Sequence, residues 1–174
     1  MLPKNMKTIL TLRHKDVYPG STPRKLKYRA RTAARAVLFD TNNRIALEFV
    51  SLRKYYKLPG GGVDKGESIL QGLRRECMEE AGCVIKVGKA IGKIVEYRDR
   101  YRIRQVSFTY FAKVVGKKGK TAFTGSEKTN KFKLQWAPLG KAITLLRKAK
   151  PSTYESGFII KRDLKFLETA KKLL

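Results

Sequence analysis

Apolar residues along the chain either alternate with polar ones or run continuously over a few positions, and both patterns are typical of strands. The longest alternating segments lie in the middle of the chain. The predicted strands are Thr8–Leu12, Ala34–Asp40, Arg44–Val50, Tyr55–Leu58, Val84–Tyr97, Ile103–Val115 and Lys133–Ala137. The second and third of them would form a hairpin. The first would be an added strand in a basic N-terminal extension, residues 1–30, where Pro19-Gly20 and Pro23 mark turns.

Helical spacing and helix-end signals predict three helices. They cover residues 68–81, residues 138–149 and the residues that follow Tyr154. Ser68 is a suitable N-cap and Gly82 a suitable C-terminal stop for the first helix. Residues 116–130 are expected to be a polar loop. Strands and helices in this order predict an α/β protein of one domain, residues 1–174, with a mixed sheet between helical layers.

The composition fits a soluble cytoplasmic protein. No apolar run approaches the roughly 20 residues that a membrane span needs, and the N-terminus is too interrupted for a secretory signal. Cys77 and Cys83 are too few for a disulfide framework or a zinc site, and we expect buried thiols. The only histidine, His14, is expected at the surface.

Net charge is the unusual feature, because 40 lysines and arginines against 14 acids give +26. Such a field attracts polyanions, so nucleotides, RNA or DNA are candidate partners. A solvated basic surface would have the same composition. The charge therefore does not by itself establish a nucleic-acid site.

Acidic residues concentrate in one short stretch of this basic chain, since five of the 14 acids lie between residues 64 and 80. Glu76, Glu79 and Glu80 have i, i+3 and i+4 spacing, which places them on one helix face. Carboxylates this close repel one another unless cations neutralise them, and Mg²⁺ prefers such oxygen ligands. Taken alone, the triplet could also be an exposed acidic face that pairs with lysines.

The residues around these acids resemble the signature box of the Nudix family, GX₅EX₇REUXEEXGU, in which U is apolar. Its fixed positions are occupied by Gly61, Glu67, Arg75, Glu76, Glu79, Glu80 and Gly82. Cys77 and Cys83 stand at the two U positions, where Ile, Leu or Val is usual. Because a buried cysteine behaves as a small apolar residue, we expect looser packing rather than lost activity.

The resemblance implies an α/β/α sandwich in which the box forms a loop, a helix and a second loop, and its glutamates bind catalytic Mg²⁺, for which Mn²⁺ can substitute. By motif position, the implied metal ligands are Glu76, Glu80, Glu79 and the carbonyl of Gly61. An ion pair between Glu67 and Arg75 would brace the loop against the helix. Metals held there would clamp a diphosphate and activate water.

The sequence leaves the identity of the general base undecided. The family often places it on a loop before a strand that carries a tryptophan, which here is Trp136, and the only acid in that loop is Glu127. Glu127 would then be the base or an extra ligand. An exposed loop glutamate is the alternative, with Glu79 or Glu80 as the base.

Residues outside the box would determine which substrate binds. The candidates are Arg98, Tyr101 and Arg104. The arginines could hold phosphates, and Tyr101 stands at a position resembling the tyrosine of the dinucleoside-polyphosphate hydrolases. Packed aromatics and a solvated basic turn are the alternatives.

The predicted function is Mg²⁺-dependent cleavage of a diphosphate bond in a nucleoside triphosphate, or in a nucleoside diphosphate linked to another moiety. Two alternatives use the basic surface: a nucleic-acid-binding protein without catalysis, and an RNA-decapping type of enzyme. The complete set of box glutamates disfavours a pure binder. The expected partners are a nucleotide, nucleic acid bound non-specifically, and a second copy in a homodimer, but no membrane.

Overall fold

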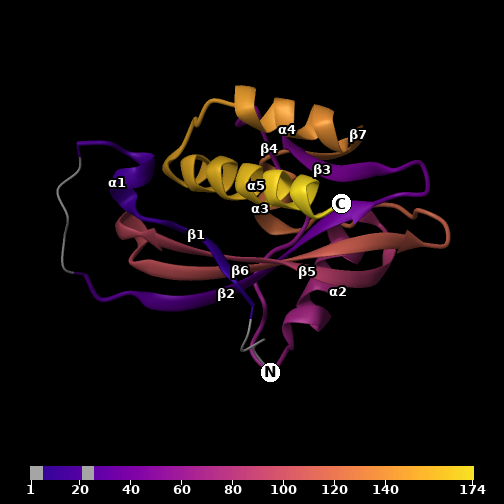
Figure 1. The fold of residues 1–174 in the computed structure, drawn as a ribbon, viewed down its shortest axis with the longest axis horizontal. Helices are drawn as coiled ribbons and strands as arrows, with labels where there is room; N and C mark the ends of the chain where they lie inside the picture. The colour runs from indigo at the N-terminus through magenta and orange to yellow at the C-terminus, as the bar shows by residue number, and fades with distance from the viewer. Residues whose placement is uncertain (1–5, 21–25) are drawn as a thin grey trace.

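The computed structural model describes residues 6–20 and 26–174 and has a mixed, seven-stranded sheet in the order β1-β5-β6-β2-β3-β4, with β7 beside β3 (Figure 1). The strands are β1 (Thr8–Leu12), β2 (Arg29–Phe39), β3 (Arg44–Val50), β4 (Tyr55–Lys57), β5 (Val84–Arg98), β6 (Ile103–Val115) and β7 (Phe132–Pro138). The helices are α1 (His14–Val17), α2 (Ile69–Ala81), α3 (Gly125–Thr129), α4 (Leu139–Lys148) and α5 (Tyr154–Leu173). Residues 1–5 and 21–25, with the predicted turn at Pro23 and part of the N-terminal extension, lie outside the described residues.

The sheet centres on β2 and β6, which pair in parallel along the whole of β2. The predicted hairpin of β2 and β3 forms only at its turn, where Phe39 pairs with Ile45. Beyond that point, residues 59–63 occupy the same edge of β2, and the Ala34 N–H donates to the Gly61 carbonyl at 3.0 Å. Strand β3 pairs with β7 along its full length instead. This arrangement lays the glycine-rich loop directly on β2.

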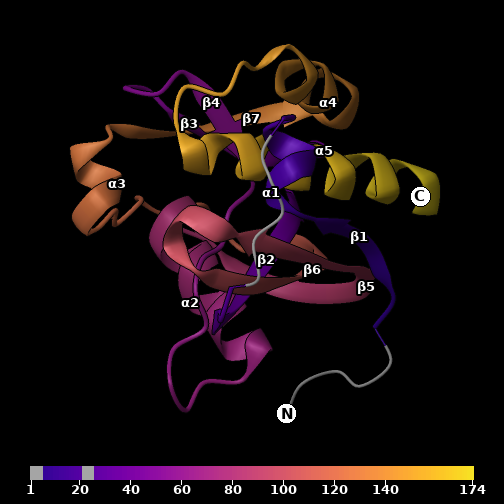
Figure 2. The same cartoon turned by 90° about the vertical axis from the view of Figure 1, so that its left-hand side faces the viewer.

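Alternation along the strands divides the core between the two faces of the sheet. On β2, Ala34, Ala36 and Leu38 pack with α2, whereas Val37 and Phe39 pack with α4 and α5. Figures 1 and 2 show α5 between the long strands β2, β5 and β6 and the group β3, β4 and β7, with α2 and α4 on opposite outer sides. The α/β/α prediction is confirmed.

Helix α2 begins and ends as the sequence predicts. Ser68 is its N-cap and accepts a hydrogen bond from the Gln71 N–H, and Gly82 ends it in the left-handed conformation. Cys77 and Cys83 are buried free thiols, also as expected. No helix in residues 6–20 and 26–174 is both long enough and apolar enough to cross a membrane.

The N-terminal extension contributes a strand, as predicted, because β1 pairs in parallel with the edge strand β5. The expected surface position of His14 holds in part. Helix α1 packs on α5, so the His14 ring is half-buried and its Nδ1 lies 3.0 Å from the Tyr154 hydroxyl. The extension is therefore part of the folded body.

The predicted loop 116–130 contains a short helix, α3, that the sequence analysis missed. The segment is polar and has no apolar periodicity to indicate a helix. Its local signal is a capping box, in which the Thr124 N–H donates to the Glu127 carboxylate at 2.8 Å. The same contact fixes the orientation of Glu127.

Candidate functional site

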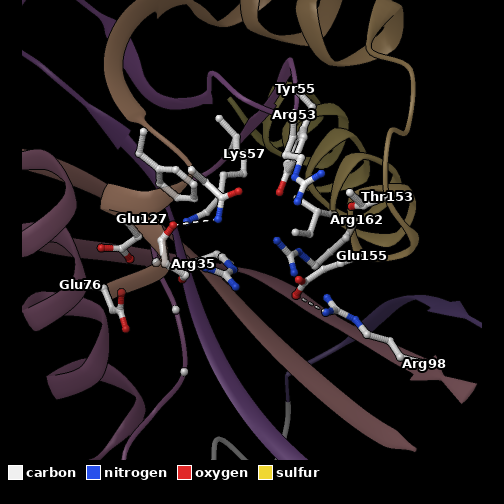
Figure 3. A pocket seen from close by; sticks show the side chains of 18 of the residues that line it. Arg35, Arg53, Tyr55, Lys57, Glu76, Arg98, Glu127, Thr153, Glu155 and Arg162 are labelled. Carbon is white, nitrogen blue, oxygen red and sulfur yellow. Dashed lines mark hydrogen bonds and ion pairs between the residues drawn. The ribbon is translucent and has the colours of Figure 1, made fainter. Parts of the chain in front are cut away.

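A pocket of about 450 Å³ opens beside the glycine-rich loop that follows β4 (Figure 3). Its walls include residues of β2, β4, β5, α2, α3 and the first half of α5. In Figure 3, Glu76 and Glu127 lie at one end, Arg53 and Arg98 lie at the other, and Arg35 lies between them. The pocket thus has an acidic end and a basic end.

Three carboxylates meet at the acidic end. Glu76 and Glu80 lie one turn apart on the buried side of α2, and Glu127 approaches them from α3. One oxygen of each lies within 4.8 Å of the others. Burial and the neighbouring Glu80 raise the pKa of Glu76, against the effect of Arg75. Mutually repelling carboxylates of this spacing fit a hard divalent cation such as Mg²⁺.

Two glycines let the loop backbone approach this cluster. Gly60 has a φ of +126°, and a Cβ atom there would lie 2.1 Å from the Ala34 carbonyl oxygen. A Cβ atom on Gly61 would lie 2.3 Å from a Glu76 oxygen. Only glycine therefore fits at position 60, and a side chain at position 61 would push the Glu76 carboxylate aside. The Gly61 carbonyl accepts one hydrogen bond and keeps a second lone pair, so it can serve as a ligand beside Glu76.

Glu80 is fully buried and is held by two donors. The Lys57 ammonium lies 2.9 Å from one of its oxygens, and the Gly60 N–H lies 2.5 Å from the other. Lys57 also lies 2.5 Å from Glu48. Burial raises the pKa of Glu80, but Lys57, Glu48 and the Gly60 N–H together lower it by more, whereas burial and Glu80 raise the pKa of Glu48. Lys57 therefore favours the charged form of Glu80 and fixes its orientation.

Arg75 fastens the loop to α2, as the sequence predicts for a structural ion pair. Its Nε lies 2.9 Å from Glu67, and its Nη2 donates to the Gly62 carbonyl at 3.0 Å. The hydrogen bonds from Arg75 lower the pKa of Glu67 to about 2. Glu79 lies 3.4 Å from Arg75 and is not one of the three clustered carboxylates. The structure thus separates Glu79 from the other two box glutamates.

The loop that carries Glu127 is fastened to the end of α2. The Gly119 N–H donates to the Gly82 carbonyl at 2.7 Å, and the Ala122 N–H donates to the Glu79 carbonyl at 2.6 Å. Because these bonds are made by the box helix itself, the loop and the helix form one unit. Glu127 therefore reaches Glu76 and Glu80 from a fixed direction.

The same loop is held at its start by a buried carboxylate. The Lys118 ammonium lies 2.6 Å from Asp40 and 3.7 Å from the centre of the Trp136 ring. Arg44 also pairs with Asp40, at 2.9 Å. Burial raises the pKa of Asp40, but Lys118 and Arg44 lower it by more, to about 2.

Asp40→Asn is expected to lower the free energy of unfolding by about 2 kcal/mol at neutral pH, since the pKa of Asp40 is lower in the folded chain than in the unfolded one. A lowered carboxyl pKa stabilises the fold above the unfolded value of 3.8, and this stabilisation is lost as the pH falls towards about 2. Urea unfolding at several pH values measures the effect. Glu168→Gln, which breaks an exposed ion pair, should change stability far less. If the difference in unfolding free energy between wild type and Asp40→Asn stayed the same at low pH, the charge of Asp40 would not be what stabilises the fold.

A buried polar network lies behind the basic end of the pocket. Glu96 is completely buried and contacts Arg98 at 2.8 Å and Arg162 at 3.5 Å. It also accepts from the Gln105 amide at 2.8 Å, and the Gln105 oxygen accepts from Arg31 at 2.8 Å. One carboxylate therefore connects three arginines that line the pocket, two of them directly.

The sequence analysis missed most of the cations that line the pocket. They are Arg31, Arg35, Arg53, Lys57 and Arg162. A signal was present, because Arg35 and Glu48 are charged residues flanked by apolar ones inside the predicted strands ARAVLFD and RIALEFV. Burying a charge is costly unless it is paired or used. Such positions are therefore candidates for a functional site.

Of the three predicted substrate-binding residues, two line the pocket and one does not. Arg98 lies in the pocket wall, nearly buried and 2.8 Å from Glu155. Tyr101 also lines the pocket and is 47% exposed, so its ring is open to a ligand. Arg104 is not among the lining residues and donates to the Tyr97 hydroxyl at 3.3 Å.

Comparison with known proteins agrees with this geometry. A family model described as the NUDIX domain matches residues 29–156. The fold resembles that of a MutT protein from Methanosarcina mazei Go1, at 17% identity over 85% of this chain and 99% of that chain, with a TM-score of 0.55. It also resembles a NUDIX hydrolase from Nitrosomonas europaea, at 17% identity over 83% and 90% of the two chains, with a TM-score of 0.62.

A further similar structure is the NUDIX domain of NrtR from Shewanella oneidensis in complex with ADP ribose. The two are 19% identical over 88% of this chain and 94% of that chain, with a TM-score of 0.55. Identities this low show a shared fold. The search of curated proteins found no match.

Proposed function

Because the matched domain spans residues 29–156, this chain belongs to the Nudix family, and we propose that it hydrolyses a diphosphate bond in a nucleotide-derived substrate with Mg²⁺. The observation that carries the proposal is the meeting of Glu76, Glu80 and Glu127 at one end of a pocket whose other end is basic. An acidic end suits a divalent cation, and a basic end suits phosphates.

Glu76, Glu80 and the Gly61 carbonyl are the groups that would hold the metal, with Glu127 beside them. Bound there, Mg²⁺ or Mn²⁺ would neutralise charge on the phosphoryl oxygens and promote attack by water. Lys57 holds Glu80 in the ionised form that such a ligand needs. The Glu67–Arg75 pair keeps the loop and the helix together.

The protein's own groups supply orientation and proton transfer. Arg31, whose guanidinium lies beside Gly62, would hold non-bridging oxygens of the diphosphate. Glu127 would accept the proton of the attacking water, since burial raises its pKa and makes it a stronger base than a free carboxylate. Tyr101 at the rim would contact the nucleoside part.

A substrate panel tests the proposed function. Purified protein is incubated with nucleoside triphosphates, nucleoside diphosphate sugars, ADP-ribose and dinucleoside polyphosphates, with Mg²⁺, with Mn²⁺ or with EDTA. Metal-dependent release of a nucleoside monophosphate or of pyrophosphate would support the proposal. Turnover that is equally fast in EDTA would contradict it.

Glu127→Gln is expected to lower kcat by about 100-fold with little change in KM, because it removes the proposed proton acceptor but preserves the shape of the loop. Steady-state kinetics at saturating Mg²⁺ measures the effect. Lys128→Gln, at the exposed neighbouring position, is the matched control and should retain full activity. If Glu127→Gln lost activity only at low Mg²⁺ and recovered at high Mg²⁺, the residue would be a ligand rather than the base.

The net charge of +26 supports a second candidate, an RNA substrate such as a capped end. An RNA site would bind short capped RNA more tightly than uncapped RNA at moderate salt. Binding that is equal for both and disappears at moderate salt would indicate plain electrostatic attraction.

A further inference from the structure

Arg35 is the buried cation that the described structure leaves least compensated. Arg35 is 5% exposed, and its Nε and Nη1 atoms have no hydrogen-bond partner among the described residues. Figure 3 shows its side chain entering the pocket between the acidic and basic ends. The guanidinium stays charged at neutral pH, because burial lowers the pKa of Arg35 only to about 10. A buried cation with unused donors destabilises a fold unless an anion binds to it.

Other buried cations of the pocket are already paired. Lys57 contacts Glu48 and Glu80, and Arg162 contacts Asp163 at 2.7 Å. Carboxylates of the protein therefore largely neutralise the charges of Lys57 and Arg162.

Two further arginines of the lining lack a carboxylate partner among the described residues. Arg31 contacts the neutral Gln105, and Arg53 makes no described ion pair. Among the described residues, the pocket arginines without a carboxylate at ion-pair distance are therefore Arg31, Arg35 and Arg53. A diphosphate near the carboxylates would use one of these cations and leave the others available.

The basic end also contains the start of a long helix. Thr153 is the N-cap of the 20-residue α5 and lines the pocket together with Glu155. The Ser152 hydroxyl donates to the Arg53 carbonyl at 2.8 Å, so Arg53 and the start of α5 are neighbours. The Thr153 hydroxyl accepts from the Ser156 N–H, which leaves the N–H groups of Tyr154 and Glu155 as the anion-favouring groups of this turn. The Glu155 carboxylate lies 2.8 Å from Arg98, which also contacts Glu96.

We propose that Arg35, Arg53 and the first turn of α5 form a subsite for a phosphate monoester that the substrate carries in addition to the diphosphate that is cleaved. Cleavage of such a substrate rests on the proposed function, whereas its binding at this subsite does not. The inferred substrate class is a nucleotide conjugate with a separate, dianionic phosphate group. A planar guanidinium suits this group because it can donate two parallel hydrogen bonds.

Paired probes that differ by one phosphate monoester test the subsite. Suitable pairs are coenzyme A with its 3′-dephospho form, and ADP-ribose 2′-phosphate with ADP-ribose. We expect the wild-type protein to prefer at least one phosphorylated partner by about tenfold or more in kcat/KM, in line with one charge-assisted contact. Arg53→Gln and Arg35→Met should bring that ratio close to one. Arg147→Gln, at an exposed arginine of α4, is the charge-matched control and should keep the ratio.

Calorimetric binding of the same pairs in EDTA separates this proposal from the proposed function. A preference for the phosphorylated partner without any hydrolysis would support the subsite while contradicting the diphosphatase. Inorganic phosphate, titrated alone, distinguishes a free ion from a substrate group. Equal wild-type affinities within both pairs would overturn the proposal, whether or not inorganic phosphate binds.

The unfolding temperature distinguishes a phosphate-binding role of Arg35 from a role in stabilising the fold. Without phosphate, Arg35→Met should unfold at a higher temperature than the wild type, because it removes an unpaired buried charge. Saturation with the preferred phosphorylated probe in EDTA should raise the unfolding temperature of the wild type but not that of the variant. A variant that unfolds at a lower temperature in phosphate-free buffer would show that Arg35 supports the fold, and the subsite would lose its main argument.

Discussion

Replacing Glu80 with glutamine is expected to reduce kcat by roughly 10³-fold, since it removes one of three clustered carboxylates and several kcal/mol of transition-state stabilisation. Glutamine preserves the size of the side chain, and Lys57 keeps its contact with Glu48, so the fold should survive. Activity at saturating substrate and Mg²⁺ is the primary measurement. The rise in unfolding temperature caused by Mg²⁺ should disappear in parallel.

Glu168→Gln is the matched control for this prediction, because it makes the same chemical change on α5 at an ion pair with the exposed Arg147. It should retain wild-type activity and the wild-type response to Mg²⁺. If Glu80→Gln hydrolysed the substrate at the wild-type rate, the assignment of this end of the pocket as the catalytic centre would be wrong.

Glu96→Gln is expected to lower the free energy of unfolding by about 3 kcal/mol, the largest stability effect that we predict. The variant removes the negative charge that Arg98 and Arg162 share, and neither arginine is exposed enough for water to replace it. Urea unfolding measures the loss. Glu155→Gln, which removes the half-exposed partner of the same Arg98, should cost less than about 1 kcal/mol.

The loss in Glu96→Gln should also depend on pH. Burial raises the pKa of Glu96, but Arg162 and Arg98 lower it by more, so its pKa in the fold is below the unfolded value. The stabilisation is therefore complete above pH of about 4 to 5 and decreases as the pH falls further. A deficit that is equal at neutral pH and in acid would instead indicate a packing defect.

Features that depend on neighbouring residues in the chain could be predicted from the sequence. The cap at Ser68, the stop at Gly82 and the spacing of Glu76 and Glu80 all act within one helix and its ends. The Glu67–Arg75 pair belongs to the same local unit. The helix and the pairing of Glu76 with Glu80 therefore follow from short-range geometry, whereas Glu127 joins them through tertiary contacts.

Features that depend on strand pairing could not be predicted in the same way. Arg35 enters the pocket because β2 pairs with β6 and because residues 59–63 lie along its other edge, contacts between segments far apart in the chain. Glu96 and Gln105 meet only through the register of β5 and β6. The basic end of the pocket is thus set by tertiary pairing, whereas two of the three carboxylates at the acidic end come from one helix.

Strand β1 has a consequence for the association of copies of this chain. It occupies the outer edge of β5 from Lys93 to Glu96, where unpaired peptide groups would otherwise be a template for a strand of another molecule. The exposed edge of the sheet here is therefore the five-residue β1 in place of the longer β5, and a short edge strand offers less backbone for edge-to-edge association. Deleting the residues that precede Arg13, or attaching a tag that displaced β1, would expose this edge of β5 and favour aggregation. A fusion partner is therefore better attached after α5.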